Sequence, residues 1–392
     1  MSKALRVLVV SDVSAEEVHG GAERMLVHHL RALKDQGHEV TMLTRQPQTE
    51  EPLIIHLDNG IIEYRLPYEG SRGPAGLKQL RQGATAWWRE HGGAFDVVVA
   101  EQPFTIWALL KAGCKLPRLQ VCHSFAFEEY ATRHGRHGGL KHWLAGLAMR
   151  RLERMVYRSA AGFLVLSRFM QDRLCDFFQL HRELITIAPG GVDIPTLPVV
   201  GERETWRKAL GWHGPVVMTL RNLVPRTGVD LLVDAAGLLK DEIPELKWCV
   251  VGRGELMQEL KAQAERLGVK DRVEFTGYLS EADVKKRLFA ADIFMLPTRD
   301  LEGFGLVTIE ANACGLPVVA TPVTANIEVV PSLPFNRLAD AVTAEALADA
   351  VRQMLQVEYD DRSREELRSA VEKRYAWHLH DDELVKAVEA LL

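Results

Sequence analysis

Short apolar runs alternate with amphipathic stretches along nearly the whole chain. Residues 22–36 and 140–159 show the spacing of one-sided helices, and apolar runs of strand length lie between such stretches. In the first half these runs are LRVLVVS, HEVTMLT, FDVVVAE, RLQVCHS, AGFLVLS and LITIAPG. The alternation of strand and helix predicts βαβ units and a parallel sheet.

The same pattern starts again in the second half, with the runs PVVMTL, LKWCVVG, RVEFTG, ADIFMLP and LPVVAT. A stretch rich in glycine and proline, near residues 190–201, separates the halves as a linker. We therefore expect an α/β protein with two doubly wound Rossmann-like domains, residues 1–193 and 194–375. We expect a C-terminal helix, at about 376–392, to rejoin the first domain. Ligands sit at the carboxyl ends of strands in such sheets, so the expected site is a cleft across which the domains face each other.

Composition narrows the class of protein. The 392 residues are 47% hydrophobic and 26% charged with a net charge of −5, which suits a soluble globular protein and argues against a mainly nucleic-acid-binding role. Five cysteines are scattered without a C-x-x-C pair, which indicates a reducing cytoplasm and no structural zinc. The start, MSKALRVLVVSD, has too short an apolar run for a signal peptide, and no stretch approaches a membrane span. We expect a cytoplasmic protein.

The segment EGFGLVTIEANACGLPVVA places two carboxylates, Glu302 and Glu310, around a glycine bend and an apolar run. A glycine and a proline end a helix that we expect over residues 306–314. On a helical wheel Glu310 lies in the middle of the apolar arc, and Thr308 and Asn312 lie opposite. A charge on a buried face is costly unless it is paired, so we expect a polar partner at Glu310. The alternative is a solvated carboxylate at the edge of the helix.

Two helix starts are candidate anion sites, because a helix N-terminus presents backbone N–H groups and the positive end of its dipole. One is Gly20 and Gly21 in HGGAERMLVHHLRAL, although a GG pair is often only a turn and is not the GxGxxG dinucleotide pattern. The other is Gly305 and Leu306. Phosphates suit these N–H groups, whereas the neighbouring glutamates suit sugar hydroxyls. A phosphate beside sugar hydroxyls describes a nucleotide sugar.

Arg221 and Arg226 lie in the loop after the first strand of the second half, in TLRNLVPRTGVDLL. Two guanidiniums there can hold a diphosphate bidentately. Two solvated surface arginines are an equal alternative on this segment alone.

Three more positions follow predicted strands. Gly252 in VVGRGELMQEL can pass close to a base or sugar, and Tyr278 in FTGYLSEADV either flanks a nucleobase or packs within its loop. His123 in VCHSFAFEEY follows a strand of the first half. A lone histidine is often structural, but its place at a carboxyl strand end makes a functional role an equal alternative.

Nearly the whole chain resembles the family 4 retaining glycosyltransferases of GT-B fold. The strongest match is EGFGLVTIEANACGLPVVAT, which is similar to the family's E-x7-E stretch, and GGAER, PGGVD, VGRGEL and FTGYLSEADV follow the family's order and spacing. The resemblance implies that Glu302 contacts the donor sugar and Glu310 the ribose. It implies that Gly305 and Leu306 offer backbone N–H groups to the donor, and that His123 lies near the transferred sugar.

These implications complete the predicted site. The predicted catalytic residues are His123 and Glu302, and the predicted donor-binding residues are Gly20, Gly21, Arg221, Arg226, Gly252, Tyr278, Phe304, Gly305, Leu306 and Glu310. The resemblance implies transfer of a hexose-type sugar, with retention, from a nucleoside diphosphate sugar to a glycan, lipid-linked or small-molecule acceptor. Cell-surface polysaccharide or glycolipid synthesis is the expected setting, with no cofactor beyond the substrate and no nucleic-acid partner.

The chain departs from the family at several positions. Asn222 and Thr227 stand where members often carry arginine and lysine, and Arg221 and Arg226 each lie one residue earlier. We expect the two arginines to replace the usual pair. The glutamate that usually follows a glycine pair is Glu328, in VTANIE. No D-x-D occurs in the chain, which favours metal-free transfer with arginines and a helix dipole stabilising the leaving diphosphate.

Two other functions stay open. One is a non-hydrolysing epimerase of nucleotide sugars, against which the E-x7-E segment weighs. The other is a sugar-nucleotide-binding module without catalysis, for which the shifted arginines and VTANIE are the only support. The sequence leaves open the acceptor and whether the donor carries UDP, GDP or ADP.

Residues 133–159 are basic in an acidic protein. On a helical wheel Trp143, Leu144 and Leu147 share a face that continues as Arg151, Arg154 and Arg158. We hypothesise a peripheral contact with the anionic inner membrane surface or with a lipid-phosphate acceptor. A buried domain helix with solvated arginines is the alternative.

Overall fold

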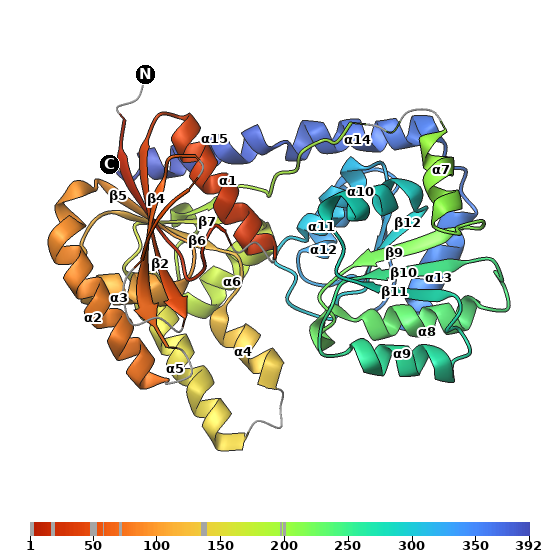
Figure 1. Ribbon diagram of the computed structural model, residues 1–392, viewed down its shortest axis with the longest axis horizontal. Helices are drawn as coiled ribbons and strands as arrows, with labels where there is room; N and C mark the ends of the chain where they lie inside the picture. The colour runs from red at the N-terminus through yellow and green to blue at the C-terminus, as the bar shows by residue number, and fades with distance from the viewer. Residues whose placement is uncertain are drawn as a thin grey trace. The chain divides into compact units, whose positions relative to one another are not determined.

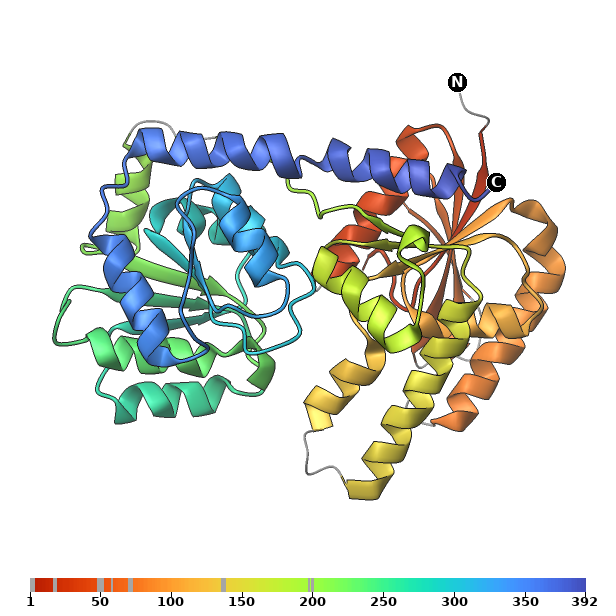
Figure 2. The same cartoon turned by 180° about the vertical axis from the view of Figure 1, so that it is seen from behind.

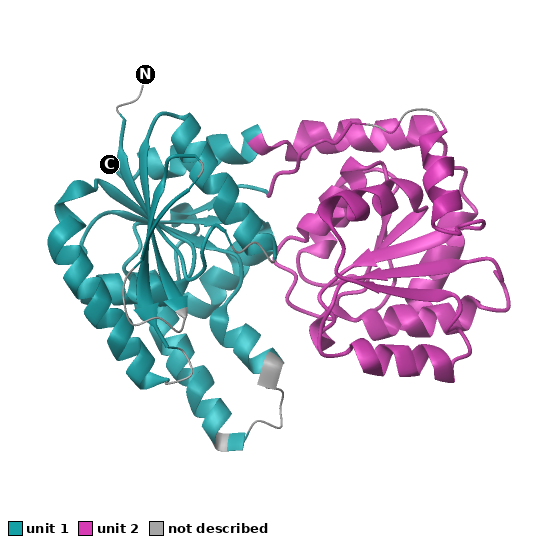
Figure 3. Cartoon of the chain, viewed as in Figure 1, with its two compact units in different colours: residues 1–189, 378–392 teal, residues 190–377 magenta. Residues whose placement is uncertain are grey.

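The computed structural model describes residues 4–16, 20–47, 53–57, 59–69, 73–134, 139–196, 198 and 201–392. The basic segment is therefore described without residues 135–138, and the linker without 197, 199 and 200. The chain forms two compact units (Figure 3): unit 1 comprises residues 1–189 and 378–392, and unit 2 comprises residues 190–377. The prediction put these two changes of domain at 193 and about 376.

Unit 1 is built on an eight-stranded sheet in the order β3-β4-β2-β1-β5-β6-β7-β8. Every neighbouring pair is parallel except β3 and β4. The strands are β1 (Arg6–Val10), β2 (Glu39–Pro47), β3 (Leu53–His56), β4 (Ile62–Tyr68), β5 (Val97–Ala100), β6 (Arg118–Cys122), β7 (Gly162–Val165) and β8 (Ile185–Ile187). The six strands predicted for this half are confirmed, and the β3–β4 hairpin is absent from the prediction.

Helices cover both faces of this sheet (Figures 1 and 2). They are α1 (Gly21–Asp35), α2 (Pro74–His91), α3 (Pro103–Lys111), α4 (Ala126–His134), α5 (Gly139–Arg158), α6 (Arg168–Phe178) and α15 (Trp377–Glu389). Leu8 and Val10 of β1 pack with α2, α3, α5 and α6, while Val7 and Val9 pack with α1 and α15. Successive side chains of a strand point to opposite faces, so the apolar residues after Arg6 in β1 supply both cores.

Unit 2 contains a fully parallel six-stranded sheet in the order β11-β10-β9-β12-β13-β14. Its strands are β9 (Val216–Leu220), β10 (Lys247–Val251), β11 (Val273–Gly277), β12 (Ile293–Leu296), β13 (Val318–Ala320) and β14 (Arg337–Leu338). The first five were predicted. The two-residue β14 is too short to leave a pattern in the sequence.

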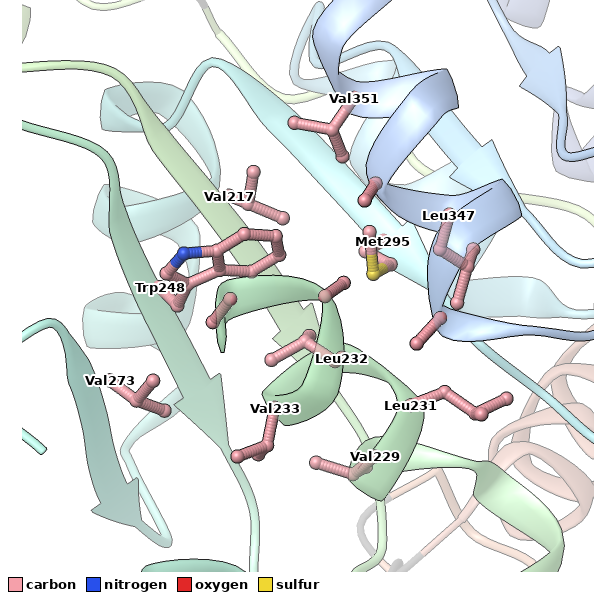
Figure 4. Close-up of a cluster of buried hydrophobic side chains, with 14 of the residues drawn as sticks. Val217, Val229, Leu231, Leu232, Val233, Trp248, Val273, Met295, Leu347 and Val351 are labelled. Atoms are coloured by element: carbon pink, nitrogen blue, oxygen red, sulfur yellow. The ribbon is translucent and has the colours of Figure 1, made fainter. Parts of the chain in front are cut away.

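The helices of unit 2 also lie on both faces of its sheet. They are α7 (Glu202–Ala209), α8 (Val229–Leu239), α9 (Met257–Arg266), α10 (Glu281–Ala290), α11 (Leu306–Ala313), α12 (Asn326–Val329), α13 (Ala344–Leu355) and α14 (Asp361–Tyr375). Figure 4 shows the core on one face, where Trp248 and Val217 of the sheet meet Leu232 of α8 and Leu347 of α13. The opposite core joins the sheet to α10 and α11. This packing fixes α11, whose first residues include predicted site positions.

Short 3-10 helices complete the two units, at Gly92–Ala94, Arg182–Leu184, Pro225–Thr227 and Val330–Ser332. Among the described residues, no helix combines the length and the apolarity that a membrane crossing requires.

Candidate active site

The carboxyl edge of the unit 2 sheet brings together Arg221, which follows β9, and Thr298 and Glu302, which follow β12. Glu302 Oε2 accepts a hydrogen bond from Arg221 Nη2 at 2.7 Å and from Thr298 Oγ1 at 3.1 Å. The side chains of Arg221 and Glu302 are only 9% and 12% exposed. Arg221 and Glu302 thus form a largely buried, charge-assisted ion pair that holds both side chains in place.

The loop that carries Glu302 is held in an unusual backbone conformation. Leu301 has φ of 58° and Thr324 has φ of 49°, both in the left-handed region that non-glycine residues seldom adopt. Glu302 N donates to Thr324 Oγ1 at 3.2 Å, and Ala325 N donates to the Glu302 carbonyl at 3.2 Å. Such conformations cost about 1–3 kcal/mol each and are concentrated at ligand-binding sites. The strain marks this pair of loops as a candidate binding site.

The start of α11 follows directly. Gly305 precedes the first helical residue with φ of +84°, which a side chain would strain. Phe304 is 4% exposed and packs edge-on against Tyr375, with ring centroids 5.8 Å apart. These contacts anchor the turn so that Leu306 opens the helix, whose first N–H groups have no intrahelical partners. The predicted anion position therefore lies three to four residues after Glu302 in the same ordered loop.

The helical wheel for this segment was right that Ile309, Ala311 and Ala313 are buried and wrong about the polar positions of the helix. Thr308 and Asn312 are fully buried, whereas Glu310 is partly exposed. Asn312 donates to the Leu316 carbonyl and exchanges two hydrogen bonds with the side chain of Asn336. Polar side chains lie inside because the fold supplies them with partners, and Glu310 lies on the more open side with Leu306. The helix itself was predicted to within one residue, and Gly315 ends it with φ of +69°.

Arg221 and Arg226 have different partners on the same loop. Arg226 Nη1 lies 3.4 Å from the Leu301 carbonyl, next to the Glu302 that Arg221 contacts. Thr227, at the position where family members often carry lysine, is buried with its hydroxyl 2.8 Å from the Asn222 carbonyl. It stabilises its own loop. The two arginines border one loop, and Arg221 already neutralises a carboxylate there.

Gly252 and Tyr278 lie beside this cluster. A Cβ atom on Gly252 would lie 1.9 Å from the Arg221 carbonyl oxygen, and Gly252 has φ of +132°, so only glycine fits. Gly252 N donates to the Gly277 carbonyl at 2.9 Å, which ties the loop after β10 to the residue before Tyr278. The Tyr278 ring is 75% exposed, with the Arg253 guanidinium 5.5 Å from its centroid. An exposed aromatic face of this kind can stack on a base.

In unit 1, His123 follows β6 and contacts Glu101, which follows the neighbouring strand β5. His123 Nε2 lies 2.8 Å from Glu101 Oε2, and His29 Nδ1 of α1 lies 2.6 Å from Oε1. Burial raises the pKa of Glu101, but the charge of His29 and the hydrogen bonds from His123 and His29 outweigh it and lower the pKa to about 2. Glu101 is a buried carboxylate between two imidazoles.

Sequence reasoning missed Glu101 and His29. Glu101 comes directly after FDVVVA, so the rule that singled out His123 at a strand end also selects Glu101. His29 lies in the middle of a helix and is fully buried, and no signal in the sequence distinguishes it from a core residue.

Gly20 and Gly21 start α1 as predicted, with Gly20 in extended backbone as the cap residue. Within the described residues, no group of three or more His, Cys, Asp or Glu side chains is arranged to hold a metal ion.

Two family models match successive parts of the chain. The model described as Glycosyltransferase Family 4 matches residues 19–195, and the one described as Glycosyl transferases group 1 matches residues 202–374. Each match covers most of one unit.

Individual proteins agree with these models. The chain is 30% identical over 232 residues to a GDP-mannose-dependent alpha-(1-6)-phosphatidylinositol monomannoside mannosyltransferase of Mycolicibacterium smegmatis, a match that spans 57% of this chain and 60% of that protein. It is 28% identical over 331 residues to a D-inositol 3-phosphate glycosyltransferase of Jonesia denitrificans, over 78% of this chain and 75% of the relative. The first of these matches thus spans less than two thirds of the relative's length.

A solved structure of sucrose-phosphate synthase from Thermosynechococcus elongatus superposes with a TM-score of 0.81. The superposition covers 98% of this chain and 99% of the synthase at 20% sequence identity. At this identity the similarity establishes the fold and nothing finer.

Proposed function

The chain belongs to the family 4 glycosyltransferases of GT-B fold, and from that premise we propose that it moves a hexose-type sugar from a nucleoside diphosphate sugar to a glycan, lipid-linked or small-molecule acceptor. The proposed setting is the synthesis of a cell-surface polysaccharide or glycolipid. Transfer of this kind needs an acceptor for the hydroxyls of the donor sugar, a binding site for its diphosphate and stabilisation of the leaving group.

The observation that carries the proposal is the Arg221–Thr298–Glu302 cluster just before α11. A carboxylate held in position by an arginine and a threonine accepts hydrogen bonds from sugar hydroxyls, and the N-terminus of α11 suits a phosphate. Arg221 Nε is buried with no hydrogen-bond partner among the described residues, so the guanidinium has donor capacity beyond Glu302. Carboxylate, guanidinium and helix start within one ordered loop match the two halves of a nucleotide sugar.

The remaining predicted residues then take complementary roles. We assign the ribose to Glu310, the diphosphate to Arg226 and the N–H groups of Gly305 and Leu306, and the base to Tyr278 beside Gly252. His123 contacts the transferred sugar. Gly20 and Gly21, at the start of α1, approach the donor phosphates.

The proposed reaction retains the anomeric configuration and needs no metal ion. Arg226, Arg221 and the α11 dipole would stabilise the negative charge that develops on the leaving diphosphate. In the same-face mechanism proposed here, the leaving phosphate oxygen takes the proton of the attacking acceptor hydroxyl. The glycosidic C–O bond to the diphosphate breaks as the bond to the acceptor oxygen forms.

We further propose a peripheral membrane contact through the start of α5. Trp143, Leu144 and Leu147 are 61%, 53% and 40% exposed, and Arg151 and Arg158 farther along the helix are exposed as well. Figures 1 and 2 show the start of α5 and the end of α4 beyond the other helices of unit 1. An exposed apolar surface next to arginines suits an anionic lipid surface or a lipid-phosphate acceptor. The mycobacterial relative's name includes a phosphatidylinositol acceptor, which agrees with this choice.

A thermal-shift screen of GDP, UDP and ADP and their hexose derivatives tests the donor proposal. A ligand that binds the folded state at about 100 times its Kd stabilises it by about 2.7 kcal/mol, so one nucleotide series should raise the melting temperature clearly. Transfer from the donor found in this way should continue in EDTA. Loss of activity on chelation, restored by magnesium or manganese, contradicts the metal-free reaction. If the sugar of the donor is epimerised when no acceptor is present, the protein is an epimerase instead.

A further inference from the structure

We propose that His29 is a buried imidazolium which, with Glu101 and His380, fixes the tautomer and orientation of His123 and so acts as a positioning residue for sugar transfer. This inference deepens the proposed function, because it rests on His123 contacting the transferred sugar. The four side chains come from distant parts of unit 1: His29 from α1, Glu101 from the end of β5, His123 from the end of β6 and His380 from α15.

The four groups form one continuous hydrogen-bonded chain. His123 Nε2 is 2.8 Å from Glu101, Glu101 is 2.6 Å from His29 Nδ1, and His29 Nε2 is 2.9 Å from His380 Nε2. The rings of His29 and His380 are nearly parallel, with 6° between their planes. His29, Glu101 and His380 are 2% exposed or less, so water does not compete for these bonds.

The hydrogen bonds of His380, at the far end of this hydrogen-bonded series, determine which of its ring nitrogens carries a proton. His380 Nδ1 lies 3.1 Å from the Ala188 carbonyl and 3.0 Å from the Pro189 carbonyl. A carbonyl oxygen only accepts hydrogen bonds, so Nδ1 of His380 carries a proton. Burial and the charge of His29 lower the pKa of His380 to about 3, so the ring is neutral at pH 7 and its Nε2 has no proton.

The count then assigns two protons to His29. Its Nε2 must donate to the unprotonated Nε2 of His380. Its Nδ1 must donate to Glu101, whose carboxylate accepts from His29 on Oε1 and from His123 on Oε2. An imidazole that donates from both nitrogens is an imidazolium. The buried charges of His29 and Glu101 compensate each other at 2.6 Å, which is the condition under which a fold tolerates them.

One further carboxyl group faces this histidine. Asp381, the next residue on α15, interacts electrostatically with His29, although burial first raises its pKa to about 6. At neutral pH it adds negative charge near the imidazolium, which favours the same protonation of His29.

This arrangement determines which atom His123 can offer. Because Glu101 accepts from Nε2, the neutral form of the His123 ring carries its proton on Nε2 and has its lone pair on Nδ1. Among the described residues, no side chain or carbonyl forms a hydrogen bond with Nδ1 of His123. His123 therefore presents a hydrogen-bond acceptor to a sugar hydroxyl. At the other end of the hydrogen-bonded series, His380 contacts the carbonyls of Ala188 and Pro189. These are the last two residues of unit 1 before the backbone enters unit 2.

The charge on His29 can be tested without a donor. We would label the full-length chain with ¹⁵N-histidine and record ring nitrogen resonances at pH 8.5, where an ordinary histidine is neutral. One of the 14 histidines should keep both ring protons, and that signal should be missing in His29→Gln. A spectrum with 14 neutral rings in the unmodified protein overturns the proposal. So does an imidazolium signal that persists in a folded His29→Gln.

Steady-state kinetics test the positioning role once a donor is known. His29→Gln and Glu101→Gln should lower kcat by about ten- to a hundred-fold, the size of effect that loss of an orienting partner has at metal-bound histidines, with the donor KM changed much less. His38→Gln is the matched control, because His38 is also buried in unit 1 but accepts a hydrogen bond from Leu5 N at the opposite edge of the sheet. If kcat is unchanged in both His29→Gln and Glu101→Gln, these residues do not position His123. If the unmodified protein transfers no sugar at all, the proposed function fails while the spectrum still decides the charge on His29.

Discussion

At the residue scale, the two glutamates of the E-x7-E segment differ in their surroundings. Glu302 is ion-paired with Arg221 and lies in a loop with left-handed residues on both sides of the contact, whereas Glu310 lies on the open side of a regular helix. A carboxylate held by an arginine and a threonine is fixed in position before a ligand arrives. That preorganisation suits a group that acts on the reacting sugar, while a helix side chain suits a ribose that does not change during reaction.

Glu302→Gln should therefore lower kcat more than it raises the donor KM, because charge develops on the sugar as its bond to the diphosphate breaks. Glu310→Gln should raise the donor KM with a smaller effect on kcat, because its contact is equal in the ground and transition states. Both variants require steady-state kinetics with the same donor and acceptor. Full kcat in Glu302→Gln together with a loss in Glu310→Gln would mean that these roles are reversed.

Arg226 and Arg221 can be separated by nucleotide binding. The proposed hydrogen bond of Arg226 to the diphosphate is charge-assisted and worth about 1.5–3 kcal/mol, so Arg226→Ala should weaken nucleoside diphosphate binding about ten- to a hundred-fold. Arg221→Ala should weaken binding less, because part of the bonding capacity of Arg221 is used on Glu302. Calorimetric titration of both variants with the nucleotide found by thermal shift measures this order. Unchanged affinity in both variants would place the diphosphate site elsewhere.

At this scale, the sequence selected positions whose roles stay predictions. His123 and Arg221 were selected because they follow strands and Glu302 because it opens the E-x7-E segment, and each lies in a polar cluster at a sheet edge. The wheel failed for Glu310 because it counts apolar neighbours, and the fold buries Asn312 by giving it hydrogen-bond partners from another segment. His29 could not be found, since its partners Glu101 and His380 are 72 and 351 residues away.

At the scale of elements, the periodicity of apolar residues predicted the long βαβ alternation. It did not predict the β3–β4 hairpin. The turn of this hairpin carries Asn59 and Gly60, a pair typical of tight hairpins, and Gly60 has φ of +75°. The neighbouring stretches are short and mix polar with apolar residues, and β3 is largely exposed. A half-exposed edge hairpin leaves a much weaker hydrophobic pattern than the buried parallel strands beside it.

The proposed membrane contact involves one helix, α5. Replacing Trp143, Leu144 and Leu147 together with serine should abolish salt-sensitive flotation with liposomes that contain anionic lipid. The three side chains are exposed, so the change should leave thermal stability nearly unaltered. Leu238→Ser is the matched control, because Leu238 is 49% exposed on α8 of unit 2. If the unmodified protein does not float with these liposomes, the contact does not exist.

The start of α4 depends on a buried carboxyl group of α5. Glu153 is 1% exposed and accepts hydrogen bonds from Ala126 N at 2.8 Å and Phe127 N at 3.2 Å. Burial raises its pKa to about 7, against the bonds that favour the charged form. A raised carboxyl pKa means that the folded state binds more protons than the unfolded state between pH 4.5 and about 7. Glu153 therefore contributes stability at low pH that is lost as pH rises through this window.

Glu153→Gln removes the carboxyl group whose ionisation lowers the stability of the folded state as pH rises. The stability of the variant relative to the unmodified protein should rise between pH 5 and pH 8, by at most about 3 kcal/mol. Urea unfolding at several pH values measures it, with Glu183→Gln as a surface control because Glu183 is exposed. A stability difference that is constant across this range would show that burial does not raise the pKa of Glu153 in solution.

At the scale of the whole molecule, the chain leaves unit 1 once and returns to it only at the end. Figure 3 shows α15, after its first residue, as part of unit 1, while α14 belongs to unit 2. Leu384 and Val388 of α15 are fully buried with Leu26 and Leu30 of α1. The sequence predicted this return from the helical tail, but it could not show that the same helix carries His380 into the interior. The C-terminal helix thus completes one core and one end of the histidine chain.

Leu384→Ala should consequently destabilise unit 1 and spare unit 2. Removing a buried leucine side chain costs about 2–5 kcal/mol, and its cavity would lie between α15 and the sheet that carries Glu101 and His123. Hydrogen exchange followed by mass spectrometry separates the two units: peptides of unit 1 should exchange faster, while those of unit 2 and the affinity for nucleoside diphosphate should stay unchanged. Leu379→Ala is the control on the same helix, because Leu379 is 39% exposed and should change stability by less than about 0.5 kcal/mol. Equal loss of protection in both units would show instead that they unfold as one body, and α15 would then stabilise the whole molecule through unit 1.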